Sequence, residues 1–195
     1  MRILALIGAL AIIVVIAAAV YFFGGYYNVA ATEPDLGIVK WALAQVRTAS
    51  IDHHAGDQPP AGYDDPAKIQ EGARVYSVIG CVNCHGVPVA PGTTWAKFSE
   101  GLHPDPPGLK ELAGDRTPSQ LFWVIKNGIK MTGMPSFALA GAKDEELWSI
   151  AAFVKKLPNI SEADYRAWTA SATAAPSLLP NQPSPEPSTP PTMSK

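Results

Sequence analysis

The spacing of hydrophobic and polar residues divides the chain into an apolar start, a long middle with helical periodicity, and a proline-rich end. Residues 3–23 form an unbroken apolar run. At ~1.5 Å per residue, a helix of this length matches the ~30 Å hydrocarbon core of a bilayer. Aromatic residues at its far end suit the membrane interface. We therefore expect residues 1–27 to be an N-terminal membrane anchor that contacts lipid.

A cleaved signal peptide is the alternative to this anchor, because residues 17–19 are alanines of the kind found at cleavage sites. We prefer the anchor, since the apolar run continues to Phe23 and exceeds the usual length of such a signal. Both alternatives send the following residues across the membrane. The charge of Arg2 agrees with a cytoplasmic N-terminus.

Residues 28–59 are expected to form a juxtamembrane helix and a linker. Four apolar residues at helical spacing predict a helix over 34–51: Leu36, Val39, Leu43 and Val46. We expect Trp41 of this helix either at the membrane surface or against the following domain. His53 and His54 lie in a segment that we expect to be a solvated loop. A metal site at this pair would need a further ligand, and the sequence shows none nearby.

Residues 60–168 have the pattern of a small all-α domain. Its expected helices are 65–80, one turn at 110–113, 117–127, 144–156, and a short helix at 161–168. Thr117 and Gln120 form a capping-box pattern with a proline between them. The segments 86–108 and 129–137 are expected to be loops, and no stretch alternates like a strand.

The end of the chain, residues 169–195, is rich in proline, serine and threonine, and its only charges are Glu186 and Lys195. Such a composition buries too little apolar surface to offset chain entropy. We therefore expect a disordered tail. By contrast, residues 60–168 contain 12 acidic and 11 basic residues. This balance argues against a nucleic-acid partner, which would require a basic face.

The segment Cys81-Val82-Asn83-Cys84-His85 carries the most specific chemistry in the chain. The pattern Cys-x-x-Cys-His is the attachment signature of c-type haem. Two thiols on one helical turn can each form a thioether bond to the same haem, and the adjacent histidine can bind its iron. The chain has only two cysteines. The motif therefore predicts one covalently bound haem c, with His85 as an iron ligand.

Two other uses of a cysteine pair fit less well. A thioredoxin-like redox pair follows a strand, whereas the residues before Cys81 have helical periodicity. A structural zinc site needs four ligands. The remaining histidines, which are His53, His54 and His103, show no ligand spacing.

Met134 is the expected second axial ligand, because a thioether suits iron in c-type haem and raises the reduction potential. Gly133 before it lets the backbone pass close to the haem ring, and Pro135 after it stiffens the loop. Met131 is the alternative, although it also suits a hydrophobic loop position. His103 is a weaker candidate, since it lies in a proline-rich stretch where we expect a surface position.

With these residues, the stretch from about Asp65 to Leu157 resembles the class I c-type cytochromes, in particular the mono-haem, membrane-anchored kind of bacteria. The resemblance rests on the haem motif, on residues 131–137 and on residues 146–157. It implies a small cytochrome c fold, in which three to five helices enclose the haem. It also implies that the first and last helices cross at Gly72, Tyr76 and Phe153. A backbone carbonyl within residues 106–109 would accept the hydrogen bond of His85.

The resemblance implies an electron carrier and no enzyme of its own, with no small-molecule substrate. It would carry electrons between respiratory membrane partners, with its haem domain on the periplasmic side of the bacterial inner membrane. A fixed haem c subunit of a dehydrogenase or oxidase complex is an open alternative. A haem peroxidase or gas sensor with an open distal site fits less well, because no histidine with a partnering acid or arginine accompanies the Met134 loop.

Overall fold

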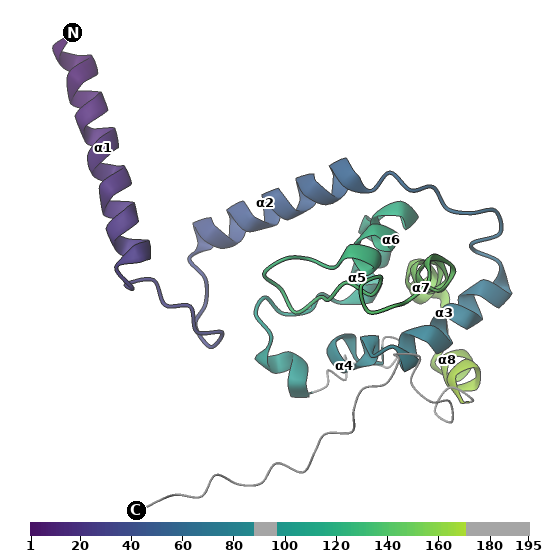
Figure 1. Ribbon diagram of the computed structural model, residues 1–195. Helices are drawn as coiled ribbons and strands as arrows, with labels where there is room; N and C mark the ends of the chain where they lie inside the picture. The colour runs from purple at the N-terminus through teal and green to yellow at the C-terminus, as the bar shows by residue number, and fades with distance from the viewer. Residues whose placement is uncertain (88–96, 171–195) are drawn as a thin grey trace, which may run out of the picture. The chain divides into compact units, whose positions relative to one another are not determined.

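The computed structural model describes residues 1–87 and 97–170, which are helical with connecting turns (Figure 1). The elements in chain order are α1 (Arg2–Phe23), α2 (Gly37–His54), α3 (Pro66–Val78), α4 (Cys81–His85), the 3-10 helix η1 (Lys97–Gly101), α5 (Leu109–Asp115), α6 (Pro118–Asn127), α7 (Asp144–Lys156), the 3-10 helix η2 (Leu157–Asn159) and α8 (Glu162–Thr169). The described residues contain no strand, which confirms the all-α class. Most of the expected tail, and residues 88–96 of the expected loop, lie outside the described residues.

Helix α1 is long and apolar enough to cross a membrane, with 22 residues and none of them buried. It belongs to the first of two compact units of the chain, Met1–Gly37. The second unit begins at Ile38 and contains the remaining helices. The elements α2 to α8 can therefore be described as one body, and α1 by itself.

The core of the second unit is the crossing of α3 and α7. A Cβ atom at Gly72 would overlap the carbonyl oxygen of Ser149 and lie 2.8 Å from the Cβ of Phe153. The two backbones meet at this point only because residue 72 has no side chain. Beside it, the rings of Tyr76 and Phe153 pack with their centroids 5.4 Å apart. The crossing implied by the resemblance is thus present.

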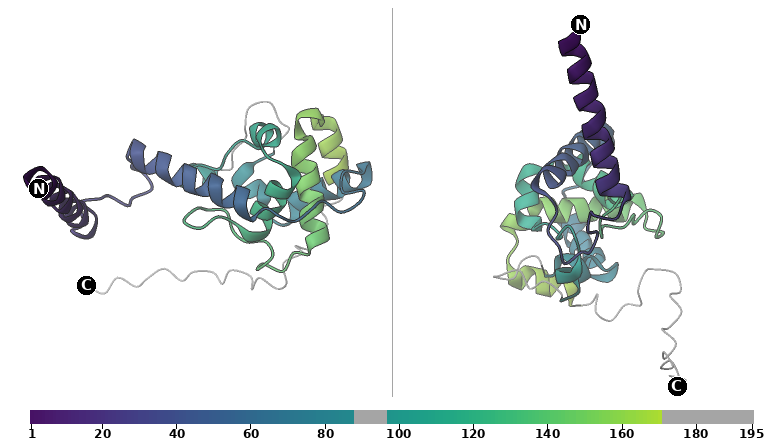
Figure 2. Two further views of the ribbon diagram at one scale, coloured as in Figure 1. Left: turned by 90° about the horizontal axis from the view of Figure 1, so that it is seen from above. Right: turned by 90° about the vertical axis from the view of Figure 1, so that its left-hand side faces the viewer.

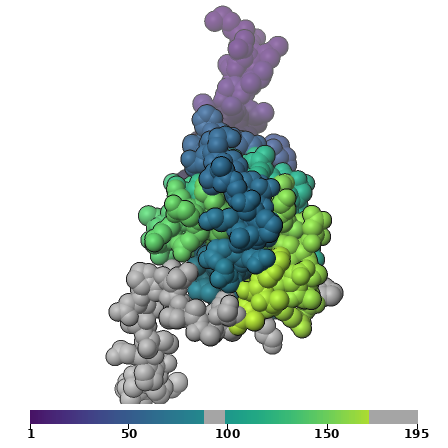
Figure 3. Space-filling model, turned by 90° about the vertical axis from the view of Figure 1, so that its right-hand side faces the viewer, coloured from purple at the N-terminus to yellow at the C-terminus, as the bar shows by residue number. Residues whose placement is uncertain are grey.

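Two further helices pack around this crossing (Figure 2). Trp148 of α7 stacks on Phe122 of α6, with ring centroids 4.0 Å apart and planes 5° from parallel. Helix α8 lies beside α3, as the yellow-green and blue-teal atoms of Figure 3 show. Its Tyr165 stacks on Phe153, and the Tyr165 hydroxyl lies 2.8 Å from the Ser77 hydroxyl.

The capping box at the start of α6 is confirmed. The Gln120 backbone N–H donates to Thr117 Oγ1 at 3.2 Å, and the Thr117 N–H donates to Gln120 Oε1 at 2.8 Å. Helix α5 is longer than the single turn expected at 110–113. Lys155 of α7 explains the difference, because its Nζ donates to the carbonyls of Ala113 and Arg116 at 2.6 and 2.8 Å. These bonds satisfy carbonyls at the end of α5 that no helical N–H reaches.

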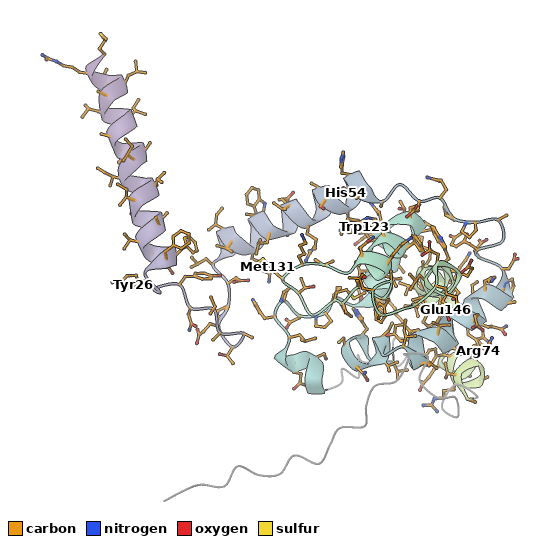
Figure 4. The ribbon with its side chains drawn as sticks, viewed as in Figure 1. Tyr26, His54, Arg74, Trp123, Met131 and Glu146 are labelled. Atoms are coloured by element: carbon orange, nitrogen blue, oxygen red, sulfur yellow. The ribbon has the colours of Figure 1, made fainter. Side chains whose placement is uncertain are left out.

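The prediction that residues 52–54 form a loop was wrong, because α2 continues through His54. Its last turn has partners from distant parts of the chain. Gln120 Nε2 donates to Asp52 Oδ1 at 2.6 Å, and Arg116 forms an ion pair with the same carboxylate at 3.6 Å. The ring of His54 lies 6.0 Å from that of Trp123 on α6 (Figure 4). These contacts hold the helix one turn beyond the predicted end.

The crossing predicts opposite effects for two helical glycines. We expect Gly72→Ala to lower the free energy of unfolding by about 1–3 kcal/mol or more, since the new methyl group meets helix backbone that cannot rotate away. Gly114→Ala, in α5 with no atom within 4 Å of a Cβ, should instead raise it by ~0.5–1 kcal/mol. Denaturant unfolding of the matured protein measures both, and equal effects at the two sites would contradict the described crossing.

Candidate functional site

The motif residues share one short helix directly after α3. Gly80, at the N-cap of α4, has φ of +99°, a left-handed conformation that glycine adopts without strain. This turn separates α3 from α4, Cys81–His85. The Gly86 N–H then donates to the Val82 carbonyl at 3.0 Å and closes the helix. The two cysteines, three positions apart, therefore lie on one face of a single helical turn.

Both cysteines are free thiols, Cys81 buried and Cys84 partly buried. Burial raises the pKa of the Cys81 thiol to about 12, and burial also raises the pKa of Cys84. Reactive redox cysteines have a lowered thiol pKa instead. Within the described part of the chain, no group of three or more His, Cys, Asp or Glu side chains is arranged to hold a metal ion. The geometry thus favours neither a thiolate redox pair nor a zinc site.

The ring of His85 is oriented by the backbone. Its Nδ1 lies 3.3 Å from the carbonyl oxygen of Pro107, within the segment 106–109 where an acceptor was expected. With Nδ1–H donating to this carbonyl, Nε2 keeps a free lone pair for a metal ion. Burial lowers the pKa of His85, and the bond to Pro107 partly opposes this shift. Burial is the larger effect, so the imidazole is neutral at neutral pH, and the bond to Pro107 orders its ring.

Met134 is partly buried and packs against the hydrophobic core of the domain, which includes Cys81. Three hydrogen bonds hold its segment of the loop. The Ile129 N–H donates to the Met134 carbonyl at 3.1 Å, the Met134 N–H donates to Thr132 Oγ1 at 3.1 Å, and the Thr132 hydroxyl donates to the Ile129 carbonyl at 2.8 Å. The thioether of Met134 is therefore presented by a closed and internally bonded turn.

The other candidate ligands lie on the surface. Met131 is 90% exposed, with φ of +59°, on the loop shown in Figure 4. His103 is exposed as well. His53 and His54 are exposed near the end of α2, and their rings contact each other at 4.9 Å. Met134 therefore packs against the core that includes Cys81, whereas these four side chains are exposed.

Gly128, at the C-cap of α6, also positions the methionine segment. Its φ is +67°, and a Cβ there would lie 2.7 Å from the Met134 carbonyl oxygen and 2.6 Å from the Pro135 carbonyl carbon. The end of α6 is thus in backbone contact with the loop. Ser136 Oγ adds a bond to the Lys126 carbonyl at 2.7 Å.

Tyr76 is a second residue whose part in the site was not foreseen. The sequence suggested only that it packs at the helix crossing. In the structure its buried hydroxyl also donates to the Gly86 carbonyl at 2.9 Å, directly after His85. This bond ties the end of α4 to the core. No local pattern signals it, because the two residues lie on different helices and meet only after the turn at Gly80.

These residues fit an iron porphyrin. Two thiols on one turn, a neutral imidazole with an oriented ring and a thioether in an apolar cluster are the donor types of a c-type haem site. Helices are the only regular elements of the described residues. This all-helical fold and this donor set together define a c-type cytochrome domain, a class that binds haem c and transfers electrons.

A family comparison gives the same class. Residues 67–154, from α3 to α7, match the family described as Cytochrome C oxidase, cbb3-type, subunit III. This part of the chain is a c-type cytochrome domain with the small cytochrome c fold. No curated protein and no solved structure gives a significant match to the chain.

The contact at Gly128 predicts a large stability cost for a single methyl group. Both Gly128 and Gly141 have positive φ, so alanine at either site should cost ~1–2 kcal/mol in backbone strain. Only at Gly128 would the new Cβ also meet loop backbone, whereas no atom lies within 4 Å at Gly141. We expect Gly128→Ala to lose clearly more free energy of unfolding than Gly141→Ala in denaturant titrations. Equal losses would show that the loop does not rest on α6.

Proposed function

We propose that this chain is a membrane-anchored electron carrier with one haem c. Cys81 and Cys84 would hold the haem by two thioether bonds, and His85 and Met134 would bind the iron from opposite sides. The observation that carries the proposal is the oriented His85 ring on the same helical turn as two free thiols. The partial burial of Met134 against the core that includes Cys81 supports its role as the second ligand.

A bound haem supplies one-electron chemistry at its iron. The chain's own residues would keep the surroundings of the iron the same in its oxidised and reduced states. The Pro107 carbonyl fixes the ring of His85, and the Ile129–Thr132 bonds fix the turn that presents Met134. The stacked Phe122 and Trp148, both buried, keep water out of the adjoining core. Little has to move when an electron arrives or leaves, which suits a carrier.

Two considerations support an extracytoplasmic location for the haem domain. Helix α1 has the length and apolarity of a membrane span. Thioether attachment of haem is completed outside the cytoplasm, so we place the haem domain on the extracytoplasmic, periplasmic side of the inner membrane. Redox proteins at the membrane would donate and accept the electrons.

A second candidate function is a fixed haem c subunit of an oxidase complex. The description of the matching family, which names a cytochrome oxidase subunit, favours it. The haem site would work in the same way in both cases, and the two differ in whether the domain stays bound to other subunits. A peroxidase or gas sensor is disfavoured, since the Met134 segment is closed by its own hydrogen bonds.

We expect the matured protein to have a six-coordinate iron. Its ferric absorption spectrum should show the weak far-red band of methionine-ligated haem, and its ferrous spectrum should not change when carbon monoxide is added. Met134→Ala should abolish the band, allow carbon monoxide to bind, and lower the reduction potential within the range of about 0.8 V over which axial ligands act.

Met131→Ala is the matched control, since this exposed methionine lies three residues away on the same loop. We expect its spectrum and potential to equal those of the unaltered protein. The reverse pattern would assign the ligand to Met131. Prompt binding of carbon monoxide by the unaltered protein would instead favour the sensor or peroxidase alternative.

Covalent attachment has its own test. When Cys81 and Cys84 are both changed to serine, acidified organic solvent should extract all of the haem, whereas the unaltered protein should retain it. Absorption of the solvent extract measures the haem released, and the mass of the polypeptide shows whether haem is still attached. Haem that stays on the double variant would show that the bond lies elsewhere in the chain.

A further inference from the structure

Helix α2 has an apolar face that the rest of the second unit leaves uncovered. Ile38 is 68% exposed, Trp41 59% and Val46 67%, and Ala49 is exposed as well. We call these four residues the apolar face of α2, because their spacing of three, eight and eleven positions puts them on one side of the helix. Gln45, exposed and uncharged, lies among them. Most of the Trp41 side chain is therefore exposed, which leaves it available for the other of its two expected positions, the membrane surface.

The opposite side of α2, its cationic side, carries two basic residues, and the exposed Leu43 lies one turn before the second of them. Residues two apart on a helix differ by about 200° in direction, so Lys40 lies opposite Ile38 and Arg47 lies opposite Ala49. Both cations are exposed. An exposed apolar side that includes a tryptophan, with basic residues on the other side, is typical of helices that lie in the surface of a bilayer.

The last two turns of α2 contact the haem domain. Ile51 is buried, and Arg116 lies 3.4 Å from Thr48 Oγ1 and 3.6 Å from Asp52 Oδ1. Gln120 of α6 adds its bond to Asp52. Figure 1 shows the C-terminal end of α2 beside α6, where the ring of His54 lies near that of Trp123. The direction of the apolar face is therefore coupled to the orientation of the haem domain.

The chain between the two helices is short. Residues 24–36 separate the end of α1 from the start of α2, and a chain of this length reaches at most ~45 Å when fully extended. It is not fully extended, since the Tyr27 hydroxyl donates to Asp35 Oδ1 at 2.7 Å. If α1 spans a bilayer, α2 begins within reach of the lipid surface, which is then the nearest apolar medium for its exposed face.

We propose that the apolar face of α2 lies on the lipid surface and that α2 thereby holds the haem domain in one orientation on the membrane. The proposal rests on the membrane anchor of the proposed function. It concerns lipid rather than a protein partner, because the chain itself carries the helix to the bilayer.

The test uses full-length, matured protein in phosphatidylcholine vesicles, with one spin label on a new cysteine. Gln45→Cys places the label within the apolar face and removes none of its four residues. Arg47→Cys places it on the cationic side, two residues further along the same helix. Ala11→Cys places it within α1.

Accessibility to oxygen, which concentrates in lipid, is compared with accessibility to a water-soluble nickel complex. Unaltered protein treated with the same label gives the background from Cys81 and Cys84, and the haem spectrum shows that each variant is folded.

We expect the labels at residues 11 and 45 to favour oxygen and the label at residue 47 to favour nickel. Labels at 45 and 47 that both favour nickel, with residue 11 in lipid, would overturn the proposal, leave the anchor intact and make a protein partner the better occupant of this face. Labels at 45 and 47 that both favour oxygen would overturn the proposed orientation. A label at residue 11 that favours nickel would overturn the anchor, and the proposal with it.

Discussion

The close approach of α3 and α7 at Gly72 is the contact on which the rest of the domain depends. Helix α3 leads directly into α4, and Tyr76 holds the end of that helix through the Gly86 carbonyl. Helix α7 carries Trp148, whose stack with Phe122 positions α6. The end of α6 in turn supports the Met134 segment. One backbone contact thus connects the two halves of the candidate site, although the chain supplies them about fifty residues apart.

Those two halves are positioned by different means. On the histidine side, His85 is placed by its position in sequence, directly after Cys84 on the same helical turn. The backbone carbonyl of Pro107 then orients its ring. The methionine side relies on a loop that closes on itself and rests on Gly128. Backbone carbonyls and glycines therefore do most of the positioning. Such contacts depend on main-chain conformation and tolerate considerable change in the surrounding side chains.

Local signals predicted much of this structure. The Thr117–Gln120 box starts α6, Pro66 begins α3, and the motif Cys81–His85 forms its own helical turn. The failures share one cause, which is a partner distant in sequence. Lys155 lengthens α5, and Gln120 with Arg116 carries α2 through His54. For the second axial ligand, the flanking Gly133 and Pro135 favoured Met134 over Met131, but the difference in burial between the two side chains depends on tertiary packing and had no local signal.

The burial of Cys81 has a consequence for biogenesis. In the folded domain its thiol is protonated, since burial raises its pKa to about 12, and it faces the core rather than solvent. A buried thiol in that state is a poor nucleophile. For the covalent attachment proposed here, the bond to the porphyrin must form while α4 is still open. Maturation would therefore precede folding, and a chain that folded too early would be unable to acquire its cofactor.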